Sequence, residues 1–292
     1  MDSFFKKVIK YAKENPIVVL LILASLYMGF TVDKFASWAN FANLISNTAV
    51  RFIIALGVSG CLITKGTDLS AGRQVGLAAC ISGILMQRAD YASRVSTFPE
   101  MNMFVVLLIV MVIGACFGII NGLIVSRLHV PPFITTLGTQ TIIYGICLVV
   151  TNAQPIGGFQ KIYTSLITAK LGDTKSFHLP LLLFVGLAFG LFFWFLYNKT
   201  RHGKYMYAIG GNETAAEVSG VNTAKTTILI YMTAGIMYAI GGFLLAGKSG
   251  GASASMGQGY ELEAIAGCTI GGVSTTGGIG TVPGILVGVL VF

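Results

Sequence analysis

Long apolar runs alternate with short polar segments along almost the whole chain. A helix needs roughly 20 apolar residues to cross a bilayer, and two stretches near the end, 262–273 and 282–292, are shorter than that. Seven runs are long enough to predict membrane-spanning helices, at 16–32, 44–64, 69–87, 103–126, 131–150, 179–197 and 226–246. The pattern therefore predicts an all-α, polytopic helical membrane protein. We expect a single transmembrane domain over 1–292, with short re-entrant or broken helices near the C-terminus.

The two ends of the chain add two expectations. Four lysines between positions 6 and 13 precede the first apolar run, as they would in a signal peptide, but no small-x-small cleavage site follows promptly. We therefore expect an uncleaved first span. The last run stops at Phe292 without a flanking charge, so we expect a truncated sequence whose last span or spans follow this residue.

Composition supports a membrane protein. Hydrophobic residues make up 54% of the chain and charged residues only 10%, against roughly 25% charged in soluble domains, and the mean hydropathy is +0.80. The net charge of +8 does not suggest a nucleic-acid partner, because most basic residues lie in loops or at span ends. The cysteines form no Cys-x-x-Cys pair and the histidines share no ligand spacing, so we expect neither a metal site nor a cofactor in this chain.

The basic residues also predict an orientation. Short loops on the cytoplasmic side of a membrane carry an excess of lysine and arginine. A cytoplasmic N-terminus puts the shorter and more basic links on that side, with Lys6, Lys7, Lys10, Lys13, Lys65, Arg127, Lys199, Arg201, Lys204 and Lys225. The polar segment 198–225 then faces the cytoplasm, and the segment 151–178 lies outside.

The cytoplasmic polar segment carries the start and stop signals of a very short helix. Asn212 can cap its N-terminus and Gly220 can end it, while Glu213 and Glu217 suit its N-terminal half. These signals predict a helix from about Glu213 to Ser219. A helix of about two turns is marginal in isolation, so we expect a partner, within this chain or outside it, to hold the helix.

A second polar motif joins two apolar runs almost without a linker, at 67–74. Its polar residues can cap the following helix or fall within its first turns. Two interpretations stay open: capping with an anchor at the membrane interface, or an ion pair or gate. The side chains with these alternatives are Asp68, Ser70, Arg73 and Gln74, together with Arg51 in the preceding span.

A third motif follows Pro131 and Pro132, which suit the start of a helix. Its polar side chains recur at spacings of three and four residues, so they form one patch on a helix. They are Thr135, Thr136, Thr139 and Gln140. In lipid such a patch faces protein or water, so it predicts either hydrogen bonds between helices or hydroxyls that line a path for a polar, uncharged solute.

Glycines recur every four residues in several apolar runs. Examples are Gly114, Gly118 and Gly122, the series Gly280, Gly284 and Gly288, and the pair Gly267 and Gly271. Small residues at this spacing let helix backbones approach closely in lipid. The pattern predicts close helix packing, and crowded interfaces of this kind also allow sliding between conformations.

The chain shows no energy source of its own. A match to the phosphate-loop pattern at 242–249 is a coincidence, because it closes a predicted membrane helix where the pattern requires a strand, a loop and a helix. Ion-driven carriers generally need buried carboxylates, and here Glu261 and Glu263 only border a short apolar run. An ion-coupled secondary carrier is therefore a weaker alternative, and the lack of a nucleophile–base pair disfavours an intramembrane enzyme.

Several motifs follow one another in the order seen in the sugar permeases of bacterial ABC importers. They are Thr67-Asp-Leu-Ser-Ala-Gly-Arg-Gln74, Pro132-Phe-Ile-Thr-Thr-Leu-Gly-Thr139, Ala208-Ile-Gly-Gly-Asn212 with Ser219-Gly-Val221, and Ile270-Gly-Gly-Val-Ser274. Asp-Leu-Ser and Ala-Ile-Gly-Gly-Asn resemble ribose-type permeases in general, whereas Ser70-Ala-Gly-Arg-Gln74 is similar to the galactose/methyl-galactoside branch. The resemblance covers essentially the whole chain, although family members continue beyond its end.

The resemblance implies the ABC importer permease fold and a transport subunit that is not itself an enzyme. It implies import of galactose or methyl-galactosides across the bacterial cytoplasmic (inner) membrane, with ribose, xylose or nucleosides as alternatives. The implied partners are a cytoplasmic ATP-binding subunit, an external sugar-binding protein that is periplasmic or lipid-anchored, and a second copy of the chain. The family's coupling segment, which docks on the ATPase, matches 205–221. Its coupling residues would be Asn212, Glu213, Ala215, Ala216, Glu217, Ser219 and Gly220, positioned by Arg201, Lys204 and Lys225.

Overall fold

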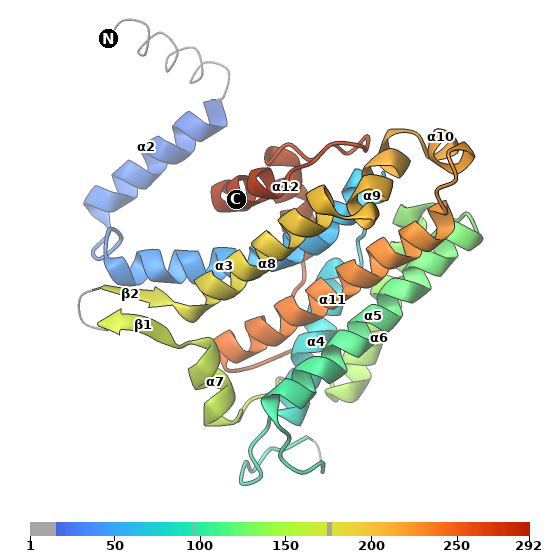
Figure 1. The fold of residues 1–292 in the computed structure, drawn as a ribbon. Helices are drawn as coiled ribbons and strands as arrows, with labels where there is room; N and C mark the ends of the chain where they lie inside the picture. Colours follow the sequence, from blue (N-terminus) through green and yellow to red (C-terminus); the bar gives the residue numbers. More distant parts are fainter. Residues whose placement is uncertain (1–15, 96, 174–176) are drawn as a thin grey trace, which may run out of the picture.

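The computed structural model describes residues 16–95, 97–173 and 177–292. Over these residues the chain forms a helical bundle with one small antiparallel sheet (Figure 1). The helices are α2 (Pro16–Thr31), α3 (Trp38–Ile63), α4 (Ala71–Leu85), α5 (Met103–Arg127), α6 (Pro132–Val150), α7 (Lys161–Ile167), α8 (Leu181–Lys199), α9 (Arg201–Gly211), α10 (Glu213–Val218), α11 (Thr223–Ser249), α12 (Tyr260–Ile270) and α13 (Val282–Val291). The sheet pairs β1 (Lys170–Asp173) with β2 (Phe177–Pro180). The prediction of a polytopic helical protein is confirmed.

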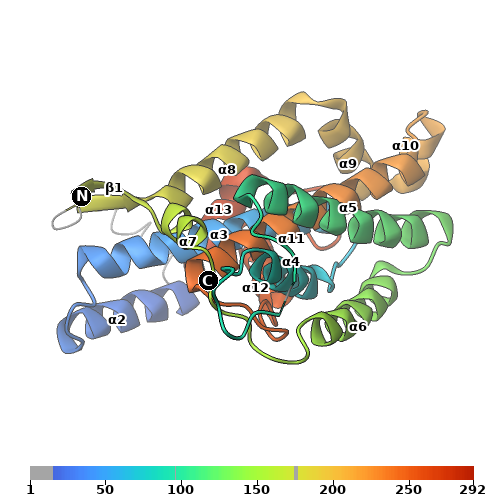
Figure 2. The same ribbon diagram turned by 90° about the horizontal axis from the view of Figure 1, so that it is seen from below.

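Five helices, α3, α5, α6, α8 and α11, are long and apolar enough to cross a membrane. α11 packs against α3, α4 and α5, and α5, α6 and α8 lie around it (Figure 2). Most of α3 and α11 is buried, whereas most residues of α5, α6 and α8 are exposed or only partly buried. The outer helices expose apolar side chains such as Leu108, Phe133 and Leu191, which match the apolar character of lipid tails.

The bundle has two distinct ends. α9 and α10 lie at one end, together with the C-termini of α5 and α8; we call it the α10 end (Figure 1). The two-stranded sheet and α7 lie at the other, which we call the sheet end (Figure 1). Long helices connect the two ends, so the bundle matches a protein that crosses a bilayer with α10 on one side and the sheet on the other.

The first of two broken crossings is the segment from α3 to α4. After α3 ends, residues 64–70 form a non-helical loop, and α4 begins only after this loop. Just after α4, Gln87 forms a β-bridge with Phe159, on the connection that leads to α7. The predicted span 69–87 is therefore a helix of 15 residues, and the loop before it covers the rest of the crossing.

The second broken crossing runs from the end of α11 to the start of α13. Near its start, Ala252 forms a β-bridge with Ile156, which belongs to the same connection towards α7. Near its end, Gly278 N donates to Ile63 O, 2.8 Å away, at the C-terminus of α3. The short helices expected near the C-terminus are thus α12, which is part of a crossing, and α13, which follows it.

Glycines let the central helices pack closely. A Cβ on Gly114 or Gly118 of α5 would overlap the carbonyl oxygens of Gly235 and Tyr231 in α11, inside the 3.0 Å that real Cβ atoms keep. Gly271, the C-cap of α12, meets the backbone of α13 in the same way. The close packing predicted from the four-residue spacing is confirmed for these helices.

Gly118→Val is expected to destabilise the bundle by about 1–3 kcal/mol, because added core volume forces backbone shifts. The nearest atoms that the new Cβ would meet, Tyr231 O, Tyr231 C and Met232 Cα, are all backbone atoms that no side-chain rotation can move. The apparent melting temperature of the purified protein in detergent measures the effect. Gly138→Val in α6 is the matched control, because a Cβ there meets nothing within 4 Å, and equal losses in both variants would contradict the packing argument.

Two polar segments contain more structure than the hydrophobic pattern predicted. The segment 151–178 holds α7 and β1 and leads into β2. Residues 201–211 form α9, whose N-cap Thr200 accepts a hydrogen bond from Gly203 N at 3.3 Å. Neither segment has an apolar run long enough to span a membrane, so a search for spans does not find them.

Candidate functional site

α10 is the short helix predicted in the polar segment, and both of its ends have the predicted caps. The Asn212 side chain accepts a hydrogen bond from Ala215 N at 3.0 Å, which satisfies one of the free N–H groups of the first turn. Gly220 has a φ of +85°; its N–H donates to Glu217 O, and the next N–H donates to Ala216 O. This pair of bonds is a Schellman motif. Local signals therefore both start and end this helix.

α10 protrudes from the α10 end of the bundle (Figure 1). Ala216 is buried, whereas every other residue of the helix is exposed. Val218 is 85% exposed, so this helix of six residues presents an aliphatic side chain on the surface of the protein. A helix this short with so few contacts is marginal by itself, which suits a segment that docks on another protein.

The cations expected to position α10 lie near it in sequence but do not pair with it. Arg201, Lys204 and Lys225 are exposed. Across the part of the chain that the structure describes, no ion pair joins them to Glu213 or Glu217. The caps, and not these cations, hold α10 here, so the electrostatic role of the cations stays a prediction.

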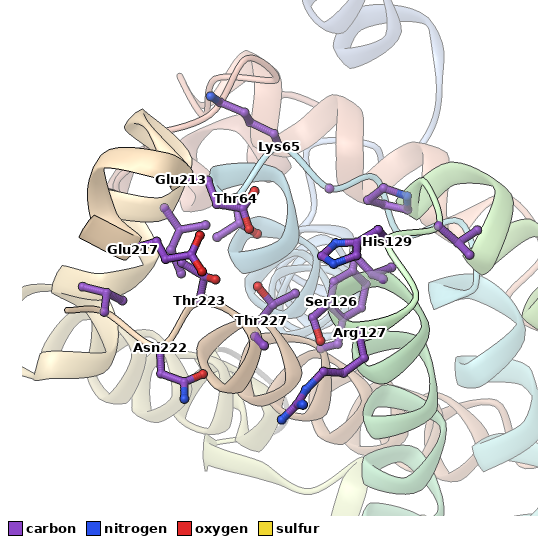
Figure 3. A pocket seen from close by; sticks show the side chains of 18 of the residues that line it. Thr64, Lys65, Ser126, Arg127, His129, Glu213, Glu217, Asn222, Thr223 and Thr227 are labelled. Atoms are coloured by element: carbon purple, nitrogen blue, oxygen red, sulfur yellow. The ribbon is translucent and has the colours of Figure 1, made fainter. Parts of the chain in front are cut away.

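A polar cavity of about 830 Å³ separates α10 from the ends of α3, α5 and α11 (Figure 3). Glu213 and Glu217 of α10 lie on one side of it, and Ser126, Arg127 and His129 lie on the other (Figure 3). Further lining residues come from the end of α3 and the start of α11, namely Thr64, Lys65, Asn222, Thr223 and Thr227. Because α10 forms one wall, a displacement of α10 changes the shape of this cavity.

A second polar group lies inside the bundle, at the start of α4. Ser70 Oγ donates to Asp68 Oδ1 at 2.6 Å and accepts from Gln74 Nε2 at 2.9 Å. Ser70 N also donates to Asp68 Oδ1, 2.9 Å away. Asp68, Ser70 and Gln74 are all at most 3% exposed, so their polar atoms depend on these internal partners.

This group continues into α5 and α6. Asn121 Nδ2 donates to Ser70 Oγ at 3.0 Å, and Thr139 Oγ1 donates to Asn121 Oδ1 at 2.6 Å. Thr136 Oγ1 accepts from Leu69 N at 3.0 Å. We call these residues the polar core, and its members are Asp68, Ser70, Gln74, Asn121, Thr135, Thr136 and Thr139, with Thr135 contributing its carbonyl oxygen to Thr139. The two motifs at 67–74 and 131–140 thus meet in space.

Arg73 and Gln140 lie outside the polar core. The Arg73 guanidinium carbon is 4.2 Å from the centroid of the Tyr144 ring, and Nη1 donates to Ala254 O at 3.2 Å. Gln140 is half-buried on α6. Within the described residues Arg73 makes no ion pair with Asp68. Asp68 accepts hydrogen bonds from Ser70, whereas Arg73 contacts α6 and the segment before α12. The structural pair that the sequence allowed is therefore not formed.

Three features of these sites were not predicted. Asn121 joins the polar core, although a single amide in an apolar run is itself a signal of an internal partner. Val218 is exposed on α10, and no pattern in the sequence distinguishes it from a buried valine. An ion pair was one alternative for Arg51, but its partner was not predicted: Arg51 and Glu263 pair at 2.9 Å across 212 residues of sequence, a separation too long for any local pattern.

Comparison with known proteins identifies the family. Residues 40–292 match the family described as branched-chain amino acid transport system / permease component. The chain belongs to this permease family. The permease is 46% identical to the galactose/methyl galactoside import permease protein of Escherichia coli (strain K12), over 98% of this chain and 86% of that relative. No solved structure matches it.

Other relatives place the permease within the family. It is 47% identical to the galactose/methyl galactoside import permease protein of Haemophilus influenzae, over 96% of this chain and 84% of the relative. It is 31% identical to the ribose import permease protein of Escherichia coli (strain K12), over 96% of this chain and 83% of the relative. The similarity to the galactoside branch that the motifs indicated is confirmed.

Proposed function

We propose that the permease imports galactose and methyl galactosides across the bacterial cytoplasmic membrane, as the membrane subunit of an ABC importer. The observation that carries the proposal is the identity of 46% and 47% to two galactose/methyl galactoside import permeases, over nearly the whole chain. A ribose-type solute is the second candidate, because a ribose import permease is still 31% identical over 96% of this chain.

In this proposal a separate cytoplasmic ATP-binding subunit supplies the energy, and an external sugar-binding protein delivers the solute. The fold supports a need for an outside ATPase, because the segment that matches the phosphate-loop pattern, 242–249, is helical throughout within α11. Its glycines, Gly242 and Gly247, are buried against neighbouring helices and cannot cradle a phosphate as a strand–loop–helix segment does. A second copy of the chain completes the proposed assembly.

The coupling role falls on α10 and its caps. With the N-terminus in the cytoplasm, the α10 end faces the ATPase. The protruding helix offers an exposed Val218 beside Glu213 and Glu217, and it forms one wall of the polar cavity. A displacement of α10 by the ATPase would therefore act directly on the ends of α3, α5 and α11, which line the same cavity. Asn212 and Gly220 act by holding the helix in shape.

The polar core has a structural role in this proposal. Most of its hydroxyls and amides are buried and hydrogen-bond to one another, although Gln74 Oε1 and Thr135 Oγ1 have no protein partner among the described residues; the mutual bonds favour the packing alternative over a solute path. The network fixes the point at which α4 begins against α5 and α6. A buried network of this kind gives the broken crossing one defined register.

The proposal is tested by reconstituting the permease in vesicles with its ATP-binding subunit and its sugar-binding protein. Uptake of labelled methyl galactoside should require ATP and should persist when an uncoupler removes the ion gradients. Excess galactose should compete with it and excess ribose should not. Uptake that needs no ATPase and collapses with the uncoupler would indicate a secondary carrier and contradict the proposal.

Val218→Asp is expected to weaken docking of the ATPase about tenfold or more, since an exposed apolar anchor at an interface is typically worth about 2 kcal/mol. The change lies at an exposed position, so the amount of folded permease should stay the same. Co-purification of the ATPase and the rate of uptake measure the effect. Val218→Ile keeps an apolar side chain and is the control, and normal docking of Val218→Asp would show that α10 is not the docking helix.

A further inference from the structure

An ion pair lies at the depth of the membrane on the surface of the bundle. Arg51 Nε is 2.9 Å from Glu263 Oε2, and the Arg51 guanidinium carbon is 5.8 Å from the centroid of the Tyr260 ring. The Arg51 and Glu263 side chains are 38% and 29% exposed. At 1.5 Å per residue, Arg51 lies about 10 Å along α3 from Leu44, where the apolar run begins. The charges are therefore neither at the membrane interface nor buried in the core.

A row of polar side chains connects this pair to the sheet end. Asn43 and Asn47 are exposed, and they precede Arg51 at intervals of four residues, so the three share one face of α3. Lys248, near the last residue of α11, donates a hydrogen bond to Asn47 Oδ1. We call this surface the outer polar face, and its members are Asn43, Asn47, Arg51, Lys248, Tyr260 and Glu263.

Lipid is a poor neighbour for this surface. A charged side chain at membrane depth costs about 2.5–3.5 kcal/mol on insertion scales. Arg51 can extend towards the headgroups along its own stem, but Glu263 is too short to do so and sits at the start of α12, inside the bundle's depth. The outer helices, by contrast, expose Leu108, Phe133 and Leu191. The contrast marks the outer polar face as a surface that meets water or another protein surface, and not lipid.

We infer that the outer polar face lines the outer half of the solute path, and that it contacts the hydroxyls of a neutral sugar on its way through. This inference rests on the proposed function, because the proposed function identifies the solute as a neutral sugar. Amide side chains both donate and accept hydrogen bonds, as a polyhydroxylated solute requires. The Arg51–Glu263 pair adds fixed donors and acceptors, and the half-buried Tyr260 beside it adds an apolar ring.

The outer polar face ends beside both broken crossings. The outer polar face ends at the start of α12, where Gly257 and Met256 pack against the backbone of Gly72 and Gly76 in α4. Two broken crossings therefore meet just beyond the ion pair. A solute that reaches Arg51 and Glu263 therefore lies next to the two crossings that are not continuous helices.

The test is the water accessibility of single cysteines in the assembled transporter in vesicles. The probe is a negatively charged, membrane-impermeant methanethiosulfonate reagent, and Cys116, the exposed native cysteine, is first replaced by Ser. Asn43→Cys and Asn47→Cys are the test variants. Leu44→Cys is the matched control, because Leu44 is 51% exposed at the same depth but on another face of α3. Ser93→Cys in the loop before α5 reports that the reagent reaches the outside.

Asn43→Cys and Asn47→Cys should react at least about tenfold faster than Leu44→Cys, because a thiol in apolar surroundings forms less of the reactive thiolate. Methyl galactoside, added with the binding protein and ATP, should slow the reaction at Asn47→Cys. Equal rates at Leu44→Cys and Asn47→Cys, or no reaction at either asparagine position while Ser93→Cys reacts, would overturn the inference. So would reaction without protection while uptake is normal. Failure of wild-type uptake would instead refute the proposed sugar, whatever the cysteines show.

Discussion

Gly210→Ala is expected to cost about 3 kcal/mol or more of folding free energy, at the upper end of overpacking effects, and to abolish uptake. A Cβ on Gly210 would overlap Ile63 O and would lie 2.6 Å from Gly278 N. Both atoms belong to backbone, and they are joined to each other by a hydrogen bond of 2.8 Å. No side-chain rotation relieves this overlap, so α9 must move away from α3 or the bond must break.

The position has a functional meaning as well. Gly210 lies in α9, directly before the coupling helix, and it touches both the end of α3 and the loop between α12 and α13. If α10 couples to the ATPase as proposed, a displacement of α10 passes through this contact into the two broken crossings. The variant should therefore lose uptake even in the fraction that stays folded and still binds the ATPase.

Gly211→Ala is the matched control for this prediction. A Cβ on this neighbouring glycine would meet nothing within 4 Å, so the same chemical change should leave the melting temperature and uptake near wild type. The apparent melting temperature in detergent, the yield of folded protein from membranes and ATP-driven uptake measure both variants. A Gly210→Ala protein with normal stability and uptake would show that the contact is not needed.

Local signals account for what the sequence predicted well. The caps Asn212 and Gly220 act within the helix that they bound, so the residues alone were enough to predict α10 and its ends. The same holds for most spans, since an apolar run of sufficient length requires nothing else. The structure of the segments between spans is harder to predict. α9 has no apolar run, and it packs on the bundle through the buried side chains of Met206 and Ile209.

Contacts between distant residues account for what was missed. The polar core needs Asn121 and Ser70, 51 residues apart, and the outer polar face needs Arg51 and Glu263, 212 residues apart. A threonine patch on one helix face looks the same whether its hydroxyls meet protein or water. The position of Asn121 beside Thr139 favours hydrogen bonds between helices, and that position depends on how α5 and α6 pack.

Ser70→Ala is expected to destabilise the permease by about 3 kcal/mol, because each buried polar group left without a partner costs about 1–3 kcal/mol. Ser70 Oγ is the hub of the polar core: it donates to Asp68 and accepts from both Gln74 and Asn121. Its loss leaves two amide donors without an acceptor in a site that is closed to water. α4 should then lose its defined start, and uptake should fall with the folded fraction.

Ser46→Ala is the control that separates the network from the mere loss of a buried hydroxyl. Ser46 is buried like Ser70, but its hydroxyl donates only to Ala42 O in its own helix, at 2.8 Å. Its replacement should cost less than about 1 kcal/mol, since no other group is left unpaired. Thermal melting of the two variants side by side measures the difference. Equal effects would mean that Ser70 contributes no more than its own hydrogen bond, and that the start of α4 is held by glycine packing against the segment before α12 instead.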